Sequence, residues 1–228
     1  MQNLNLKIEK GKFIALLGAN GVGKSTLIRT IANLQDPLAG QISLLQKNIN
    51  SYKPKEFAQI VSIVLTDPIK ASNLSVLDLV KMGRYPFTNW TGKLNIKDIE
   101  KVEEAIELCN ISYLQDANIS EISDGQLQKA MIARALSQDG QLMLLDEPTV
   151  HLDANNRYTT LELLRNLVNQ TQKTILISTH QVETAIGIAD EIWLARCGEN
   201  IISGSPKSLK ESGEIEKEFP YIHKLNYH

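Results

Sequence analysis

The chain has 228 residues, of which 43% are hydrophobic and 22% are charged, and its formal net charge is −2 at pH 7. These values are ordinary for a globular protein with a real core, and they give no electrostatic reason to expect binding to nucleic acid or to an anionic membrane. No run of about 18 apolar residues occurs, so we expect no membrane-spanning segment, and the first residues do not resemble a signal peptide. Cys109 and Cys197 lie far apart in the sequence, without metal-like spacing, which predicts two reduced thiols.

Taken in chain order, the hydrophobic patterns predict an alternation of strands and helices. A turn at Lys10 and Gly11 joins the first two predicted strands. Strands are expected at 5–8, 12–17, 41–45, 60–65, 142–145, 174–178 and 191–195. Helices are expected at 25–34, 75–82, 98–109, 123–136, 155–169 and 182–188.

Strands that alternate with helices imply an α/β protein with a parallel sheet covered by helices. Residues 67–140 differ from the rest, because their apolar residues follow the helical period and no convincing strand separates the helices. We therefore expect one domain over 1–228, with an α/β core at 1–66 and 141–228 and an all-helical insertion at 67–140. The segment 214–228 shows no clear periodicity, and we assign it no role.

Residues 18–25, Gly-Ala-Asn-Gly-Val-Gly-Lys-Ser, match the phosphate-binding pattern G-x-x-x-x-G-K-[ST]. The glycines allow backbone amides to surround phosphate oxygens, and the following helix directs its positive end at them. Lys24 is expected to bridge the β- and γ-phosphates, and the Ser25 hydroxyl to ligate Mg²⁺. The alternative, an ordinary glycine turn, is disfavoured because the pattern lies between a predicted strand and a predicted helix. Nucleotide contacts are expected from Gly18, Asn20, Gly21, Val22, Gly23, Lys24, Ser25 and Thr26.

Two adjacent carboxylates, Asp146 and Glu147, follow the apolar strand 142–145. Such a strand delivers Asp146 to the phosphate-binding edge of a parallel sheet, where it can hold Mg²⁺ through water. Glu147 is then placed to polarise the attacking water as a general base. The alternative is a strand capped by surface acids, which the presence of a phosphate loop makes less attractive.

Two further features are weaker on their own. His180 follows the strand 174–178, and although a lone histidine there is more often structural, at this edge it could contact a γ-phosphate. Ser123 precedes Gly125 and Gln126 at the start of a predicted helix, and a capped helix N-terminus is a second anion site. One ATP needs only one phosphate cradle, so the second suggests a site shared by two subunits; an ordinary capped helix is the alternative.

The order of these motifs resembles that of the ABC ATPase family from about residue 4 to 210. The family signature Leu-Ser-Gly-Gly-Gln is present here as Ile-Ser-Asp-Gly-Gln at 122–126. The resemblance implies a P-loop NTPase with a RecA-like parallel sheet, an inserted helical subdomain and a small, incomplete N-terminal antiparallel β part. It also implies that Ser123, Gly125 and Gln126 contact ATP held by a partner subunit. Leu152 and Asp153 would form the loop between two sites of a dimer, and His180 would be the γ-phosphate switch.

The chain departs from the family pattern in two places. Thr66 stands where the family has a glutamine, so the Mg²⁺ contact at this position would be lost, made through water or passed to Asp67. The aromatic residue that stacks on adenine is also missing, because only Phe13 precedes Gly18 and it lies in a predicted buried strand. We therefore expect that the chain as given begins inside the domain.

Residues 75–80 and 83–86 resemble the ATPases of importers for ferric siderophores, haem and cobalamin, although Arg84 and Tyr85 could equally be a helix end with a solvated arginine. The resemblance implies an ATP- and Mg²⁺-dependent ATPase that powers uptake of a metal chelate. It would act as a homodimer with two ATP molecules, on permease subunits, with an external substrate-binding protein, at the cytoplasmic face of the inner membrane. The alternatives are a soluble ABC ATPase of DNA repair or translation, and a nucleotide-binding module without turnover, which Glu147 and His180 disfavour.

Overall fold

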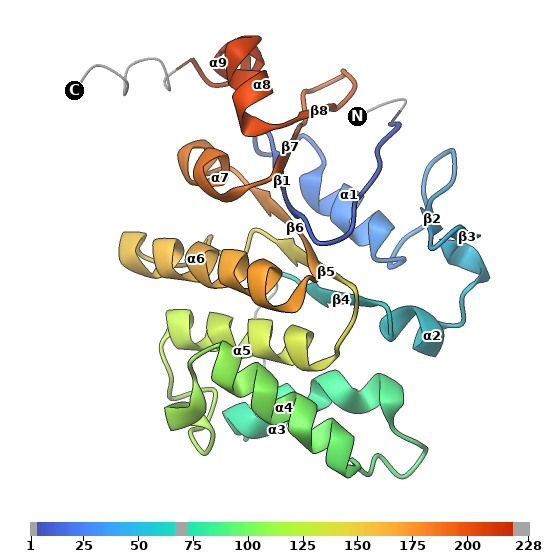
Figure 1. Ribbon diagram of the computed structural model, residues 1–228, viewed down its shortest axis with the longest axis vertical. Coiled ribbons are helices and arrows are strands. Elements are labelled where there is room, and N and C mark those ends of the chain that lie inside the picture. Colours follow the sequence, from blue (N-terminus) through green and yellow to red (C-terminus); the bar gives the residue numbers. More distant parts are fainter. Residues whose placement is uncertain (1–3, 67–72, 221–228) are drawn as a thin grey trace.

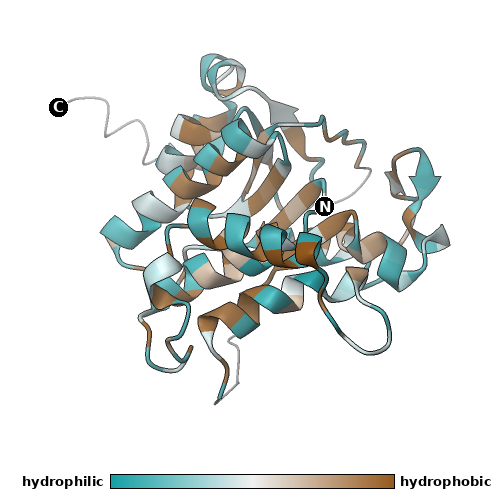
Figure 2. Cartoon of the chain, turned by 60° about the horizontal axis from the view of Figure 1, so that its bottom comes forward, coloured by the Kyte–Doolittle hydropathy of each residue, from teal (hydrophilic) through white to brown (hydrophobic). Residues whose placement is uncertain are grey.

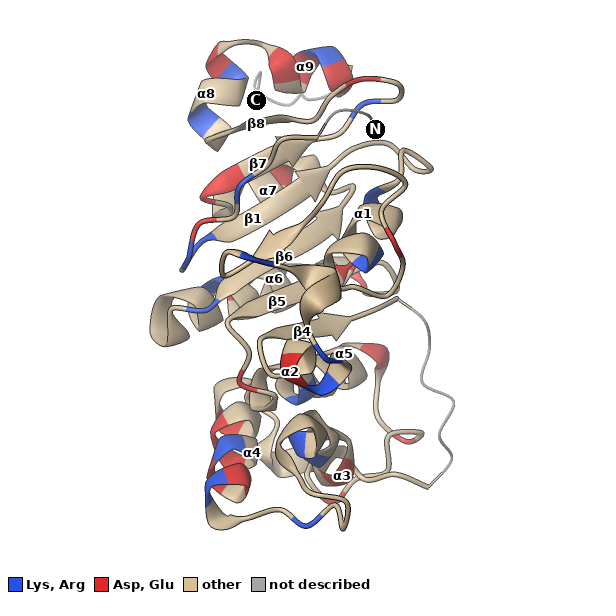
Figure 3. Cartoon of the chain, turned by 90° about the vertical axis from the view of Figure 1, so that its right-hand side faces the viewer, with Lys and Arg blue, Asp and Glu red and all other residues tan. Residues whose placement is uncertain are grey.

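The computed structural model describes residues 4–66 and 73–220. Its centre is a six-stranded sheet with the order β4-β5-β6-β1-β7-β8, in which neighbouring strands are parallel except for the antiparallel pair β7 and β8. Figure 3 shows the strands side by side in this order and largely free of charged residues. Their bounds are β1 Phe13–Leu17, β4 Val61–Val64, β5 Leu142–Asp146, β6 Thr174–Thr179, β7 Glu191–Leu194 and β8 Ile202–Gly204.

Strand β1 lies in the middle of the sheet and is buried along its whole length. Phe13 and Leu17 pack into a core cluster on one face of the sheet, whereas Ile14 and Leu16 pack into a second cluster on the other. Alternate residues of a strand point to opposite faces, so a continuous apolar run is what a doubly covered strand requires. Figure 2 shows the hydrophobic strands enclosed by helices whose outer faces are hydrophilic.

Helices cover both faces of the sheet (Figure 1). On one face, α1 (Lys24–Ile31) and α2 (Pro54–Ala58) contribute Ile28 and Phe57 to the cluster that holds Ile14. The other face carries α6 Ala154–Thr171, α7 Val182–Ile188, α8 Pro206–Glu211 and α9 Glu214–Glu218. None of the helices within 4–66 and 73–220 is long and apolar enough to cross a membrane.

Residues 73–140 form a helical part below the sheet in Figure 1. Its helices α3 (Val76–Lys81), α4 (Ile96–Leu108) and α5 (Asp124–Ser137) pack against one another, and α5 also contacts β4 and α6. Arg84 follows α3 in a 3₁₀ turn and is only 6% exposed, paired with the buried Asp98 at 2.9 Å. The alternative of a solvated arginine is therefore wrong. An unpaired buried guanidinium would be costly, and the pairing with Asp98 offsets part of that cost.

The structure differs from the sequence expectations at several elements; the helix expected at 25–34, for example, ends at Ile31. Residues 5–8 form no strand: Leu6 and Ile8 pack against the core, but no described strand lies beside them to complete a hydrogen-bonded ladder. The strand expected at 41–45 is reduced to β2 (Ser43–Leu44), paired with β3 (Lys47–Asn48) in a hairpin. The strand predicted to end at Ala195 ends at Leu194. The short elements α2, β8, α8 and α9 were not predicted, because a few residues show no measurable period.

The two cysteines are both free. Cys109 is buried in the helical part, and burial raises the pKa of its thiol to about 12, so it is an inert core residue. Cys197 is exposed. The expectation of two unpaired thiols is confirmed.

Candidate active site at the carboxyl edge of the sheet

The phosphate-binding loop connects the end of β1 to the start of α1. A β-carbon on Gly18 would lie 2.6 Å from the backbone oxygen of Ala195, so the chain can pass there only without a side chain. Gly21 and Gly23 have φ angles of 80° and 105°, which favour glycine. Gly23 precedes α1 and no side chain caps that helix, so its first backbone N–H groups face the loop. This backbone suits a phosphate chain.

Lys24 directs its ammonium group back into this loop. The side chain is 5% exposed, and Nζ donates to the backbone oxygens of Gly18 at 2.9 Å and Ala19 at 3.2 Å. Nζ also lies 3.4 Å from Oε1 of Glu147. The positive charge is therefore held between the loop and the end of β5, as a bridge between bound phosphates and the carboxyl edge requires.

Asp146 ends β5 and is 3% exposed. Its Oδ1 accepts hydrogen bonds from Ser25 Oγ at 3.0 Å and from Ser178 Oγ at 2.6 Å. Thr66 Oγ1 donates to the backbone oxygen of Asp146 at 2.8 Å. The three residues predicted to surround the metal, Ser25, Thr66 and Asp146, thus lie together, whereas Asp67 lies outside the described residues.

The oxygens gathered here fit Mg²⁺. This cation prefers hard oxygen ligands, and it is commonly held by one or two carboxylates together with waters and substrate phosphates. Ser25 and Asp146 would supply a hydroxyl and a carboxylate beside a loop built for phosphates.

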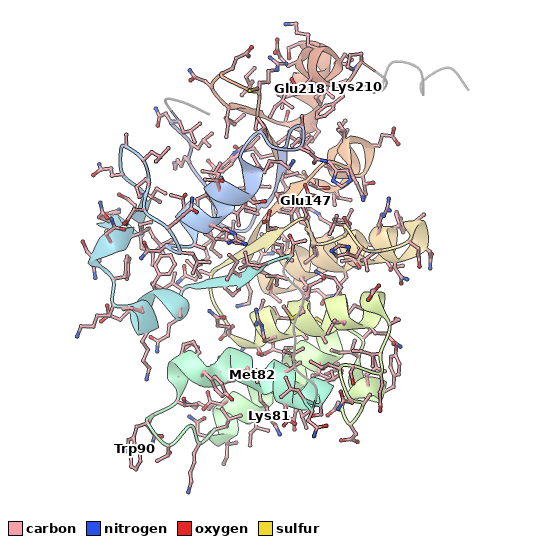
Figure 4. All side chains as sticks on the ribbon, turned by 180° about the vertical axis from the view of Figure 1, so that it is seen from behind. Lys81, Met82, Trp90, Glu147, Lys210 and Glu218 are labelled. Carbon is pink, nitrogen blue, oxygen red and sulfur yellow. The ribbon has the colours of Figure 1, made fainter. Side chains whose placement is uncertain are left out.

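Glu147 has a left-handed backbone, with φ of 48°. This conformation is uncommon for a residue with a side chain, and such strain is often found at functional sites. Its carboxylate, 13% exposed, lies between Lys24 and His180, with Oε2 2.8 Å from His180 Nδ1. His180 is 45% exposed. Figure 4 labels Glu147 near the middle of the molecule, far from Trp90 at the tip of the helical part.

Ser178 was missed by the sequence analysis, although it belongs to this site. It lies on β6, opposite Asp146 in the register of the two parallel strands, and it is fully buried. Its Oγ also accepts the backbone N–H of Glu147 at 2.9 Å. The only signal in the sequence is a serine after an otherwise apolar run, which does not reveal which carboxylate it meets.

The predicted second anion site is built elsewhere, at the start of α5. Ser123 caps this helix: its Oγ accepts the Gln126 N–H at 3.4 Å, and Gln126 Oε1 accepts the Ser123 N–H at 2.9 Å. A β-carbon on Gly125 would lie 2.9 Å from the side chain of Asn156 on α6. Among the residues described, no hydrogen bond or ion pair joins Ser123, Gly125 or Gln126 to Lys24, Asp146 or Glu147.

Asp153 caps α6, and its carboxylate accepts the backbone N–H of Asn156 at 2.9 Å and the side-chain Nδ2 at 2.8 Å. These hydrogen bonds, the backbone one foremost, lower the pKa of Asp153. Asn156 therefore bonds Asp153 and occupies the space that a side chain on Gly125 would need. The start of α5 thus lies beside the start of α6.

A family model for "ABC transporter" matches residues 1–150. The chain belongs to the ABC transporter family. Membership of this family implies ATP binding and ATP hydrolysis. The motifs met in the sequence analysis indicated the same family.

Three known proteins illustrate the similarity. An uncharacterized ABC transporter ATP-binding protein of Methanocaldococcus jannaschii is 37% identical over 227 residues, which cover 100% of this chain and 78% of that protein. The ferric enterobactin transport ATP-binding protein FepC of Escherichia coli is 34% identical over 220 residues, covering 95% of this chain and 80% of FepC. A solved structure, described as an inward-facing conformation of a proposed metal-chelate type ABC transporter, matches with a TM-score of 0.82 and 30% identity. That match covers 94% of this chain and 80% of the other.

Proposed function

We propose that this chain is the ATP-hydrolysing subunit of an ABC importer for a metal chelate. The observation that carries the ATPase part is the position of Glu147. Glu147 directly follows Asp146 in the chain. Its carboxylate lies between two groups, with Oε1 3.4 Å from Lys24 Nζ and Oε2 2.8 Å from His180 Nδ1. A carboxylate held beside a phosphate loop is suited to accept a proton from an attacking water.

The other residues of the site then take distinct roles. The amides of the loop at 18–26 hold the phosphates, and Lys24 neutralises their charge. When both of its ring nitrogens carry a proton, His180 can donate one hydrogen bond to Glu147 through Nδ1 and one to a γ-phosphate oxygen through Nε2. Ser25 and Asp146 would hold Mg²⁺, with Thr66 beside them. Mg²⁺, when bound, adds positive charge that offsets the charge of the phosphates.

Two copies of the chain would complete the site. The start of α5, with Ser123, Gly125 and Gln126, makes no hydrogen bond to the phosphate loop of its own chain. Its backbone N–H groups are therefore suited to the phosphates of a nucleotide held by a second copy. A two-fold dimer makes the same contact twice, giving two ATP molecules at one interface.

Transport is the finer part of the proposal. The name of FepC describes ferric enterobactin transport, and its sequence is similar to this chain over 95% of the chain's length. By that similarity, we assign permease subunits, an external substrate-binding protein and a peripheral position at the cytoplasmic face of the inner membrane. Residues 1–66 and 141–228 would be the catalytic core, and 67–140 the helical subdomain.

The test is coexpression with a metal-chelate permease from the same genome. We expect the chain to copurify with membranes only when the permease is present. Membrane vesicles loaded with ATP and supplied with the substrate-binding protein should take up radiolabelled iron chelates. The same vesicles carrying Glu147→Gln should assemble but show no uptake. A chain that remains off the membranes and copurifies with DNA or ribosomes would instead favour the soluble ATPase.

A further inference from the structure

One hydroxyl touches both carboxylate-bearing residues of the site. Ser178 Oγ donates to Asp146 Oδ1 at 2.6 Å and accepts the backbone N–H of Glu147 at 2.9 Å. We infer that Ser178 is a positioning residue for ATP hydrolysis, which sets the orientation of the Asp146 carboxylate and of the peptide that carries Glu147. The inference rests on the proposed ATPase role of those two residues.

The sheet register places this hydroxyl. Asp146 and Ser178 are paired on the parallel strands β5 and β6, so their side chains lie next to each other on the same face. The residues before Ser178 on β6 are the buried Ile175, Leu176 and Ile177. A buried hydroxyl among apolar neighbours is costly unless it is hydrogen-bonded, and here its donor and an acceptor lone pair are both used.

The bond to Asp146 differs from the one made by Ser25. Both hydroxyls donate to Oδ1, but Ser25 is also a proposed Mg²⁺ ligand, and its position depends on the loop. Ser178 is held by the central sheet alone. It therefore helps to keep the carboxylate in one rotamer. Within 4–66 and 73–220 no donor bonds Oδ2, which leaves that oxygen available to a water of the Mg²⁺ shell.

The bond to Glu147 acts on the backbone. The left-handed backbone of Glu147, with φ of 48°, is strained. A hydrogen bond that holds this peptide therefore opposes relaxation of the backbone to a conformation with negative φ. Without the acceptor, the Glu147 N–H loses its partner and the carboxylate can move away from Lys24 and His180. Loss of Ser178 should therefore affect both the Mg²⁺ dependence of binding and the rate of the chemical step.

The test compares Ser178→Ala and Ser178→Thr with Ser62→Ala. Ser62 is 1% exposed on β4 and bonds neither carboxylate, so it controls for the loss of any buried hydroxyl. Each substitution is made in the unaltered chain for kinetics and in a Glu147→Gln background for binding. The binding probe is a fluorescent ATP analogue, titrated once with Mg²⁺ and once with EDTA.

We expect Ser178→Ala to reduce the Mg²⁺-dependent gain in ATP affinity about tenfold, the size of one hydrogen bond to a charged group, and to lower kcat at saturating Mg²⁺. Affinity in EDTA should stay unchanged because the phosphate loop is intact. Ser178→Thr, which retains the hydroxyl, should recover most of both losses. Should Ser178→Ala not fold, Ser178→Cys takes its place and should give an intermediate loss, since a thiol is a weak donor.

Two results would contradict the inference about Ser178. If Ser178→Ala, or Ser178→Cys in its place, matches Ser62→Ala in Mg²⁺-dependent binding and in kcat, Ser178 does not position the site. If binding in EDTA falls as much as binding in Mg²⁺, its role is structural and the inference is wrong. If the unaltered chain itself has no ATPase activity, the proposed function is contradicted. That outcome is distinguishable from failure of the Ser178 inference, because it is measured without any Ser178 substitution.

Discussion

His180 Nδ1 lies 2.8 Å from Glu147 Oε2, and the other oxygen of the same carboxylate lies 3.4 Å from Lys24 Nζ. Glu147 is thus held by two groups from different parts of the chain, one in the phosphate loop and one after β6. A general base must be unprotonated and correctly oriented, and these two contacts orient the carboxylate. The arrangement makes Glu147 the most informative residue to change.

Glu147→Gln should abolish ATP turnover while ATP still binds, because the amide keeps the shape of the side chain but cannot accept the proton. A rate loss of about 10²–10⁴ is expected from removal of a general base. The measurement is steady-state phosphate release, with nucleotide binding followed separately. Glu103→Gln, an exposed change on α4, is the matched control. Near-normal turnover by the Glu147 variant would remove this residue from the role.

Mixed dimers test whether the α5 N-terminus acts on a second copy. Lys24→Ala removes the phosphate bridge, and Ser123→Arg places a long side chain at the cap of α5. Each variant alone should be inactive, but in a heterodimer both defects fall in one composite site and the other site is intact. We therefore expect mixtures to regain ATPase activity.

The control for this experiment is a direct demonstration that the subunits exchange, by mass measurement of differently tagged chains. Mixing two Lys24→Ala preparations should restore nothing. If exchange is complete and activity does not return at any ratio, the shared-site proposal fails.

The third prediction concerns the base of the nucleotide. Phe13 is fully buried in β1, as the sequence analysis expected, so its ring is not available for stacking. If no aromatic side chain stacks on the base, about 1–3 kcal/mol of binding free energy is lost, whereas phosphate contacts are the same for all nucleotides. We expect ATP and GTP to bind this chain with similar affinity in fluorescence titrations. A preference for ATP of about tenfold or more, 1.4 kcal/mol, would mean that another side chain holds the adenine.

The fourth prediction concerns the buried ion pair of the helical part. Arg84 Nε and Nη2 contact Asp98 Oδ1 at 3.0 Å and 2.9 Å, Nη1 donates to the Ser137 backbone oxygen at 2.8 Å, and the guanidinium lies 3.9 Å from the centre of the Phe87 ring. Arg84→Met would leave the Asp98 charge buried and unpaired. We expect the free energy of unfolding to fall by about 3–5 kcal/mol, measured by urea denaturation.

Two further variants make that result interpretable. Adding Asp98→Asn to Arg84→Met removes the unpaired charge and should recover part of the loss, because the amide can still accept the Asn95 N–H that Asp98 accepts now. Lys97→Met, an exposed change on the same helix, should have almost no effect. A loss below about 1 kcal/mol for Arg84→Met, typical of exposed pairs, would contradict the importance of this pair.

The sequence by itself determined the motifs whose functional residues are adjacent in the chain. The loop 18–25 contains its glycines, lysine and serine in one run, and Asp146 and Glu147 follow an apolar strand directly, so the family could be identified from local order. The long strands and helices were also predictable, since a period extends over enough residues to be recognised. Short elements such as α2 and β8 were not, and the pattern at 5–8 predicted a strand for which no described neighbour provides a ladder.

Only the tertiary structure decided which side chains meet. Ser178 lies 32 positions after Asp146, and their hydrogen bond depends on the register of two parallel strands, which no local pattern encodes. The burial of Arg84 likewise follows from the packing of α4 and α5 around it, whereas the sequence left a solvated arginine at a helix end open as an alternative. Contacts between distant segments depend on how the elements pack. The local sequence of a helix or strand is compatible with many packing partners, and only the complete hydrophobic core determines which of them it contacts.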